Sequence, residues 1–312
     1  PVLGEPHGTP DVGRRRAPCR LLYGPLAWAC SDNAAMGGLY GVMLIPRILW
    51  CTSSLGVRCG SRRAGALAAL LTLVSFGISG QLRQVSIDLP ATAAVLLVLV
   101  SMLSTQHFKR TGATLLFGAA MGLCLFTRVQ ATFFLAGPVI LWGVTALIRA
   151  GSMRAGLSVI MRLFLAALVA LAVSSTWWAG HLTSLWHIST SHLDPTQVQA
   201  RGDPSFWAGL GYYLLSLGRL CGWPMLAAAL ALLQVMIRKP PPGALLLAVW
   251  LIGGILGCSM GVHREPRYLL PGVPAMMLLV VLTLRQVEWR IYRLAGVLLL
   301  LLVAGVTWLV AQ

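Results

Sequence analysis

The chain has 312 residues, of which 57% are hydrophobic and only 10% are charged. Soluble domains carry roughly 25% charged residues, so this composition excludes an ordinary soluble globular protein. The mean hydropathy is +0.80, and the apolar residues come in blocks close to the ~20 residues that cross a bilayer core. The sequence therefore predicts an all-α fold, a polytopic transmembrane helical bundle.

The net charge of +16 would suggest nucleic-acid binding if the chain were soluble. Here most basic residues stand in short loops between apolar blocks, where they set helix orientation and meet anionic head groups. We therefore expect membrane lipids, and no nucleic acid, as partners. The seven cysteines show no CxxC spacing, so we interpret them as packing residues rather than as a metal site or disulfide framework.

Residues 1–38 are predicted to form an outer-face loop and an interfacial segment. Their apolar stretch is interrupted by Asp32 and Asn33, which would be costly inside a bilayer. The alternative is that residues 21–36 form a further span, which would account for the basic run "GRRRAPCR" before it. The chain begins at Pro1 without a methionine or a signal-like segment, so we expect it to lack its true start.

Residues 39–312 are predicted to form a transmembrane helical domain with an outer loop at 180–206. Segment 206–220, "FWAGLGYYLLSLGRL", is aromatic and only partly apolar, which is typical of an interfacial helix. About ten spanning helices are expected, because ten apolar blocks have the required length: 39–57, 64–80, 89–105, 111–127, 129–148, 163–179, 221–237, 243–260, 268–284 and 294–311.

The loops between these blocks alternate between two kinds. The first set is basic, with Glu288 as its only acid, and contains Arg58, Arg62, Arg63, Lys109, Arg110, Arg149, Arg154, Arg238, Lys239, Arg285, Arg290 and Arg293. The second set mixes both signs and contains Arg83, Asp88, Arg128, Asp194, Asp203, Arg264, Glu265 and Arg267. The positive-inside rule predicts that the first set is cytoplasmic and the second lies on the opposite side.

Two outer turns carry charges beside helix ends. Arg83 and Asp88 precede a helix with Pro90 near its first turn; this is either an ordinary helix start or part of a polar site. Arg128 lies in a tight turn between two helices, where it either reaches toward lipid head groups or binds the phosphate of an anionic lipid. Both interpretations stay open for each turn.

The outer loop at 180–206 contains three histidines. His181, His187 and His192 are six and five residues apart, so they do not share one helix face, and a solvated loop is favoured over a metal site. The stretch "GVHREPRYLLPGVPAMMLLVV" at 261–281 is different, because it crowds polar groups at the mouth of a helix. His263, Arg264, Arg267 and Tyr268 could together bind a phosphate and sugar hydroxyls, the alternative being interfacial anchoring.

Five motifs in order resemble those of the GT-C membrane glycosyltransferases, which include the protein O-mannosyltransferase and aminoarabinose-transferase-like families. "YGPLAWA" at 23–29 is similar to the family's "PPLYY" element, although Gly24 departs from it. The others are "GSRRAGALAALLTL" at 60–73, "RQVSIDLPATAAVLL" at 83–97, "LFTRVQ" at 125–130, where Arg128 replaces the usual lysine, and "HREPRYLLPGVPAMMLL" at 263–279. The resemblance covers most of the chain from about residue 23.

This resemblance implies a transferase that takes a sugar from a polyprenyl-phosphate donor and passes it to a lipid, glycan or protein acceptor. The reaction would occur at the non-cytoplasmic face of a bacterial inner membrane, within the cell envelope. Asp88 and an acid in the first outer loop are implied as catalytic, and Asp11 is the better candidate of the two acids present there. The implied substrate-binding residues are Arg83, Arg128, His263, Arg264, Arg267 and Tyr268.

The sequence leaves two alternatives to the transferase function. A transporter or flippase of a lipid-linked anionic substrate would show internal repeats and charges near the bilayer midplane, and the sequence shows neither. A non-catalytic membrane scaffold would not need clustered outer acids and arginines. No cofactor is expected, and a divalent metal stays open because no ligand set stands out. The transferase requires Arg83, Asp88, Arg128 and segment 263–268 to converge in space.

Overall fold

The computed structural model describes residues 34–82, 87–178, 205–261 and 264–286, with 294–295, 298–299, 301–303 and 305 near the end of the chain. These parts of the chain are helical and contain no strand, which confirms the predicted all-α class. The predicted site residues Asp11, Arg83 and His263 lie outside the described residues. So does most of the outer loop at 180–206, with its three histidines.

The helices are joined by short turns. In chain order they are α3 (Ala34–Cys59), α4 (Arg62–Val74), α5 (Phe76–Gln81), α6 (Asp88–Ser104), α7 (Thr111–Thr127), the 3-10 turn η1 (Val129–Ala131), α8 (Thr132–Ile148), α9 (Met153–Trp178), α12 (Phe206–Cys221), α13 (Trp223–Arg238), α14 (Ala244–Ser259), the 3-10 segment η2 (Pro266–Gly272) and α15 (Val273–Leu284).

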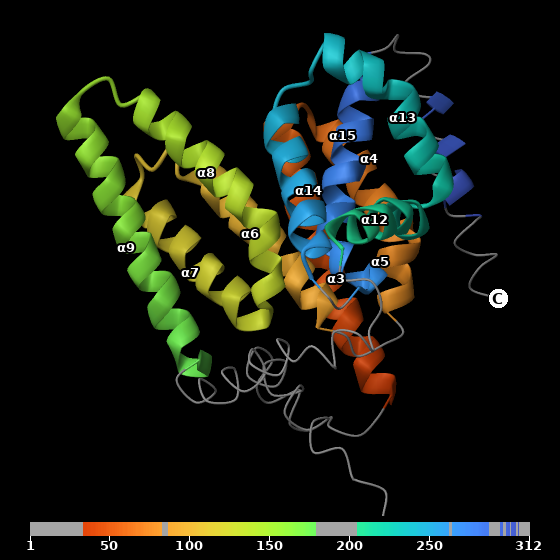
Figure 1. Ribbon diagram of the computed structural model, residues 1–312, viewed down its shortest axis with the longest axis horizontal. Helices are drawn as coiled ribbons and strands as arrows, with labels where there is room; N and C mark the ends of the chain where they lie inside the picture. The colour runs from red at the N-terminus through yellow and green to blue at the C-terminus, as the bar shows by residue number, and fades with distance from the viewer. Residues whose placement is uncertain are drawn as a thin grey trace, which may run out of the picture.

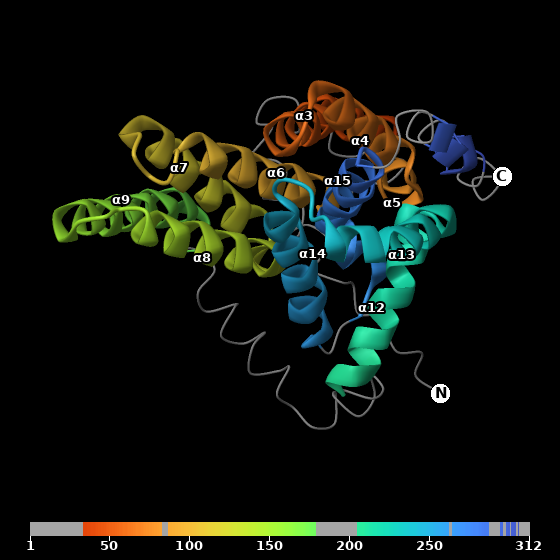
Figure 2. The ribbon, with the colours of Figure 1, turned by 90° about the horizontal axis from the view of Figure 1, so that it is seen from above.

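The helices form two groups, one on each side of α6. Helices α7, α8 and α9 form a wing on one side of α6, and α3–α5 with α12–α15 form the larger body on the other (Figure 1). Seen from above, α8 and α9 point away from α12 (Figure 2). Every residue of α15 is buried, and so are most residues of α6. Both helices are apolar around their whole circumference, which is what a fully surrounded helix requires.

The apolar helices fall into two length classes. Among the described residues, Met153–Ser175 and Pro266–Leu284 are long and apolar enough to cross a membrane, and α12 with α13 would add a third span if that bent pair is one unit. Four further apolar helices, α6, α7, α8 and α14, have 16 or 17 residues, about 24–26 Å at 1.5 Å per residue. The protein is a helical membrane protein, and the number of ten spans stays a prediction.

Four predicted blocks differ from the observed helices by more than a turn or in kind. The block 39–57 begins five residues earlier, at Ala34. The block 64–80 is two helices, because the chain leaves the helical conformation at Ser75. The block 163–179 begins ten residues earlier, at Met153, because Arg154 and Arg162 are charged but still helical. The block 268–284 starts as a 3-10 segment, in which Pro271 has no N–H to donate to an α-helical bond.

The segment predicted as an interfacial helix, 206–220, is α12. The Ser205 side chain accepts a hydrogen bond from the Ala208 N–H and so caps its first turn. At its other end Gly222 has φ of 91°, a left-handed value that glycine adopts without strain. The axes of α12 and α13 therefore differ by 113°, and α12 lies across the bundle while α13 runs along it (Figure 1).

The loops at the two ends of the bundle carry different charges. The α8–α9 and α13–α14 connections lie at the upper end in Figure 1, and they carry residues of the basic set such as Arg149, Arg154 and Arg238. The start of α6, the end of α7 and the segment η2 lie at the other end. The described residues of the basic loop set and those of the mixed-charge loop set thus lie at opposite ends of the bundle.

Candidate functional site

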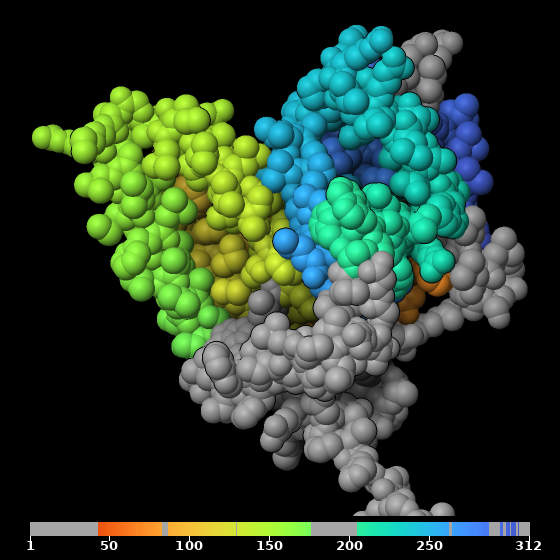
Figure 3. Space-filling view, viewed as in Figure 1, coloured from red at the N-terminus to blue at the C-terminus, as the bar shows by residue number. Residues whose placement is uncertain are grey.

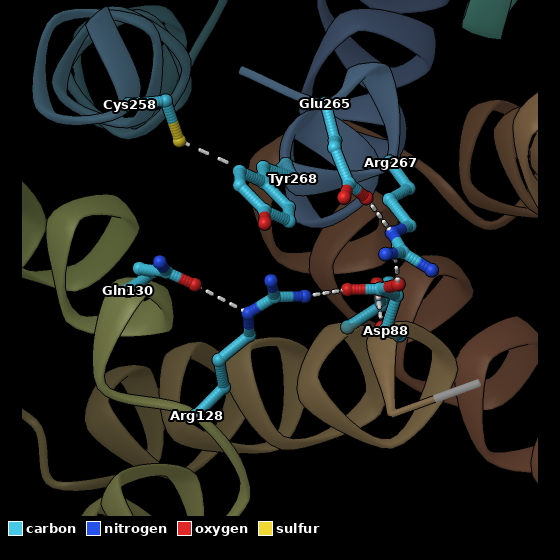
Figure 4. Close-up of polar contacts among 8 residues, drawn as sticks. Asp88, Arg128, Gln130, Cys258, Glu265, Arg267 and Tyr268 are labelled. Carbon is cyan, nitrogen blue, oxygen red and sulfur yellow. Dashed lines mark hydrogen bonds and ion pairs between the residues drawn. The ribbon is translucent and has the colours of Figure 1, made fainter. Parts of the chain in front are cut away.

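Three segments far apart in the chain meet at the second end of the bundle: the start of α6, the turn between α7 and α8, and η2. They bring Asp88, Arg128 and Arg267 together (Figure 4). Asp88 is the first residue of α6, where a carboxylate is favoured by the helix dipole. Pro90 follows in the first turn, where no N–H is needed for the helix.

The Asp88 carboxylate faces a guanidinium on each of its oxygens. Its Oδ1 is paired with Nη1 of Arg128, and its Oδ2 lies 3.6 Å from Nε of Arg267. Asp88 is only 2% exposed. A buried carboxylate is strongly unfavourable unless it is paired and hydrogen-bonded, so these two contacts explain how the charge is accommodated.

Arg128 is held on several sides. Its backbone N–H donates to the Cys124 carbonyl and ends α7. Its Nε donates to Oε1 of Gln130 at 2.5 Å, and the guanidinium carbon lies 4.1 Å from the centre of the Tyr268 ring, over its face. Burial lowers the pKa of Arg128, but an arginine side chain stays protonated in proteins and keeps its charge. Arg128 is thus a fixed positive charge, and its side chain is only 15% exposed.

Arg267 is the accessible cation of the cluster. Its side chain is 44% exposed, and its Nε is also paired with Oε2 of Glu265, whose side chain is 37% exposed. Its two terminal nitrogens make no hydrogen bond to any described residue. A guanidinium with free N–H groups at a protein surface can bind two oxygens of a phosphate side by side. The cluster therefore combines a buried ion pair, Asp88 with Arg128, and the partly exposed guanidinium of Arg267, whose terminal nitrogens have no partner among the described residues.

The structure brings together four of the predicted site residues, Asp88, Arg128, Arg267 and Tyr268. Arg264 instead contacts the start of α12, where its Nη2 donates to the Ser205 carbonyl at 2.7 Å. In the described ranges no group of three His, Cys, Asp or Glu residues is arranged to hold a metal ion.

Glu265 and Gln130 belong to the cluster, although neither was among the predicted site residues. Each stands two residues from an arginine of the site, Glu265 before Arg267 and Gln130 after Arg128. That spacing in a turn or a 3-10 segment was the available signal. Loop charge and residue type do not indicate which polar side chains in a turn pair with each other, and therefore neither residue was predicted.

The fold is similar to that of a known membrane enzyme. No protein-family model and no curated protein matches the chain. The crystal structure of ArnT from Cupriavidus metallidurans bound to undecaprenyl phosphate superposes with a TM-score of 0.63 at 18% identity, over 86% of this chain and 50% of ArnT. The structure of the same ArnT in the apo state gives a TM-score of 0.56 at 20% identity, over 83% of this chain and 46% of ArnT.

The chain thus spans about half the length of the ArnT structures that it resembles. The resemblance predicted from the five sequence motifs is confirmed for the fold: this is an all-α membrane protein with a fold similar to that of ArnT.

Proposed function

We propose that the protein transfers a sugar from a polyprenyl-phosphate donor to an acceptor at the non-cytoplasmic face of the membrane. The observation that carries this proposal is the cluster in which Asp88 holds Arg128 and Arg267 at one end of the bundle. The ArnT-like fold supports it, because one of the two ArnT structures holds undecaprenyl phosphate.

In this reaction the acceptor oxygen attacks the anomeric carbon, and the bond from that carbon to the phosphate oxygen breaks. The polyprenyl phosphate leaves with additional negative charge, which a positioned cation stabilises. Arg267 is suited to that task because its terminal nitrogens are exposed and unbonded to described residues. Arg128 adds a fixed positive charge behind it.

Asp88 acts as a positioning residue in this proposal. A general base must be able to take a proton, but both oxygens of Asp88 face arginines and the residue is buried. It orients the two guanidinium groups instead. The base that accepts the proton of the acceptor remains Asp11, as the sequence predicts, and the sugar and the acceptor are left open.

The sidedness of the proposal follows from the charge distribution between the two ends. Short loops rich in arginine and lysine stay in the cytoplasm, and these lie at the end opposite the cluster. We therefore assign the cluster to the outer surface of a bacterial inner membrane.

The test is transfer of labelled sugar from polyprenyl-phosphate donors in membranes that contain the full-length protein. Arg267→Ala is expected to lower transfer by about 10²–10³-fold, the usual effect of removing one donor to a developing charge. Membrane insertion should be unchanged because Arg267 is partly exposed. Arg238→Ala, at the opposite end of the bundle, is the matched control and should transfer normally.

Normal transfer by Arg267→Ala would contradict the proposal. A transporter would give a third result, in which labelled lipid crosses the membrane while no sugar is joined to an acceptor. Measuring both transport and covalent product in the same membranes separates the two functions.

A further inference from the structure

A second polar feature lies on α9, away from the cluster. A hollow of about 410 Å³ is lined by Arg154, Leu157, Ser158, Met161 and Arg162. Arg154, Ser158 and Arg162 follow each other at intervals of four residues, so they form one line along a helix face. Leu157 and Met161 border that line and are 62% and 60% exposed. The hollow thus combines two cations and a hydroxyl with an apolar margin.

Helix α9 is positioned to face lipid. Only 17% of the most apolar part of Met153–Ser175 is buried within the protein, and α9 forms the outer edge of the wing (Figure 3). It packs mainly along α7, where a side chain at Gly118 would collide with the backbone of Ala166. This close packing leaves the opposite face of α9 to the bilayer, with its first turns at the level of the head groups.

Arg162 connects the hollow to the neighbouring turn. Its Nη1 donates to the carbonyls of Phe108 and Lys109 at 2.7 and 2.8 Å. In that turn Gln106, His107 and Phe108 have φ of 51°, 60° and 60°, left-handed values that are strained for residues other than glycine. Arg162 therefore holds a strained turn in place, and the turn brings the backbone of Lys109 beside the hollow.

No carboxylate neutralises these cations within the described ranges. The two described acids are Asp88 and Glu265, and both belong to the cluster at the other end. Helix α7, whose N-cap is Arg110 and whose C-cap is Arg128, separates the ends by about 25 Å, given its 17 residues at 1.5 Å each. A basic, partly apolar hollow at the bilayer surface is complementary to a molecule with an anionic head and acyl chains.

We propose that this hollow binds one acidic phospholipid of the leaflet at the basic end of the bundle. Its phosphate would be held by the guanidinium groups of Arg154 and Arg162 and by the Ser158 hydroxyl. An acyl chain would lie along Leu157 and Met161. The site is separate from the one proposed for the polyprenyl-phosphate donor and does not depend on that function.

The test is native mass spectrometry of the full-length protein titrated with short-chain phosphatidylglycerol, using phosphatidylcholine as the neutral comparison. Wild type is expected to retain one phosphatidylglycerol more tightly than the rest. Each lost arginine near an anionic head group should weaken binding about fivefold, so Arg154→Gln with Arg162→Gln should weaken it about 25-fold. The matched control, Arg238→Gln with Lys239→Gln, removes the same charge at the same end outside the hollow and should change binding less than twofold.

The single variant Arg154→Gln tests binding without disturbing the fold. Arg154 has no polar contact with a described residue, whereas Arg162 holds the turn. This variant should weaken phosphatidylglycerol binding about fivefold with unchanged resistance to unfolding. Equal weakening in the hollow and control variants would show that binding follows surface charge alone and would overturn the proposal. So would equal retention of phosphatidylcholine, or displacement of the lipid by millimolar inorganic phosphate alone.

Discussion

The two ends of the bundle handle positive charge in opposite ways. At one end Arg128 and Arg267 are paired with the two carboxylates of the described chain, Asp88 and Glu265. At the other end Arg58, in the last turn of α3, has only neutral partners among the described residues, the Val100 carbonyl at 3.3 Å and the Ser104 hydroxyl at 2.9 Å.

The difference between the two ends follows from how deeply the charged groups are buried. Asp88 is buried, and a buried charge without a partner is strongly destabilising. Arg58 is exposed, so water and lipid head groups can solvate it. In the described part of the chain, the acids therefore lie where the arginines converge on a site, and none lies beside the arginines at the basic end.

The largest expected effect is that of Arg128→Met. It removes the guanidinium that is paired with the buried Asp88 carboxylate and should lower the free energy of unfolding by about 3–5 kcal/mol. Unfolding in mixed detergent micelles measures this. Combining Arg128→Met with Asp88→Asn should recover a large part of the loss, because the second substitution removes the buried negative charge that Arg128 neutralises. A combined variant less stable than Arg128→Met would refute the ion-pair account.

Asp88→Asn alone should have the next largest effect. Arg128 keeps its contacts with Gln130 and Tyr268, so the expected loss is about 1.5–3 kcal/mol, as for a hydrogen bond between charged groups. Turnover should fall more than donor affinity, because the arginines lose their alignment but not their charge. If both the rate and the affinity are unchanged, Asp88 serves only to begin α6.

Arg58→Met provides the comparison at the basic end. It removes two hydrogen bonds of an exposed side chain, so the free energy of unfolding should fall by about 1 kcal/mol or less. The same unfolding assay applies. A loss as large as that of Arg128→Met would mean that the two ends do not differ in the way described above.

The smallest effect on stability is expected for Glu265→Gln. Its pair with Arg267 is about 40% exposed on both sides, and such pairs contribute about 0.2–1 kcal/mol. Because Glu265 competes with a phosphate for Arg267, undecaprenyl phosphate should bind two- to threefold more tightly to this variant. Weaker binding would show that Glu265 helps to present Arg267 instead of competing for it.

Apolar periodicity and length were sufficient to predict most helices. Block 111–127 coincides with α7, and block 89–105 is shifted by one residue from α6. Average hydropathy does not reveal a helix break within a uniformly apolar stretch, such as the one at Ser75. It also excludes charged residues that are helical at the membrane surface, such as Arg154 and Arg162. These boundaries depend on neighbouring helices and on the bilayer surface.

The sequence was sufficient to predict most residues of the site, but not which of them contact each other. Asp88, Arg128, Arg267 and Tyr268 all stand at helix ends that the loop alternation puts on one side. That Asp88 would be enclosed by both arginines could not be predicted, since it depends on how closely η2 approaches the start of α6. The same closeness leads us to propose that Asp88, which the resemblance implies as a catalytic residue, positions the two arginines.

The buried ion pair also bears on how the protein is made. The carboxylate of Asp88 leaves the ribosome 40 residues ahead of the guanidinium that neutralises it, and Arg267 follows much later. A lone carboxylate resists entry into hydrocarbon, so α6 should wait at the translocon until α7 and its terminal arginine have emerged. The two helices would then enter the bilayer as a hairpin, with Arg267 completing the neutralisation once the last part of the bundle has been synthesised.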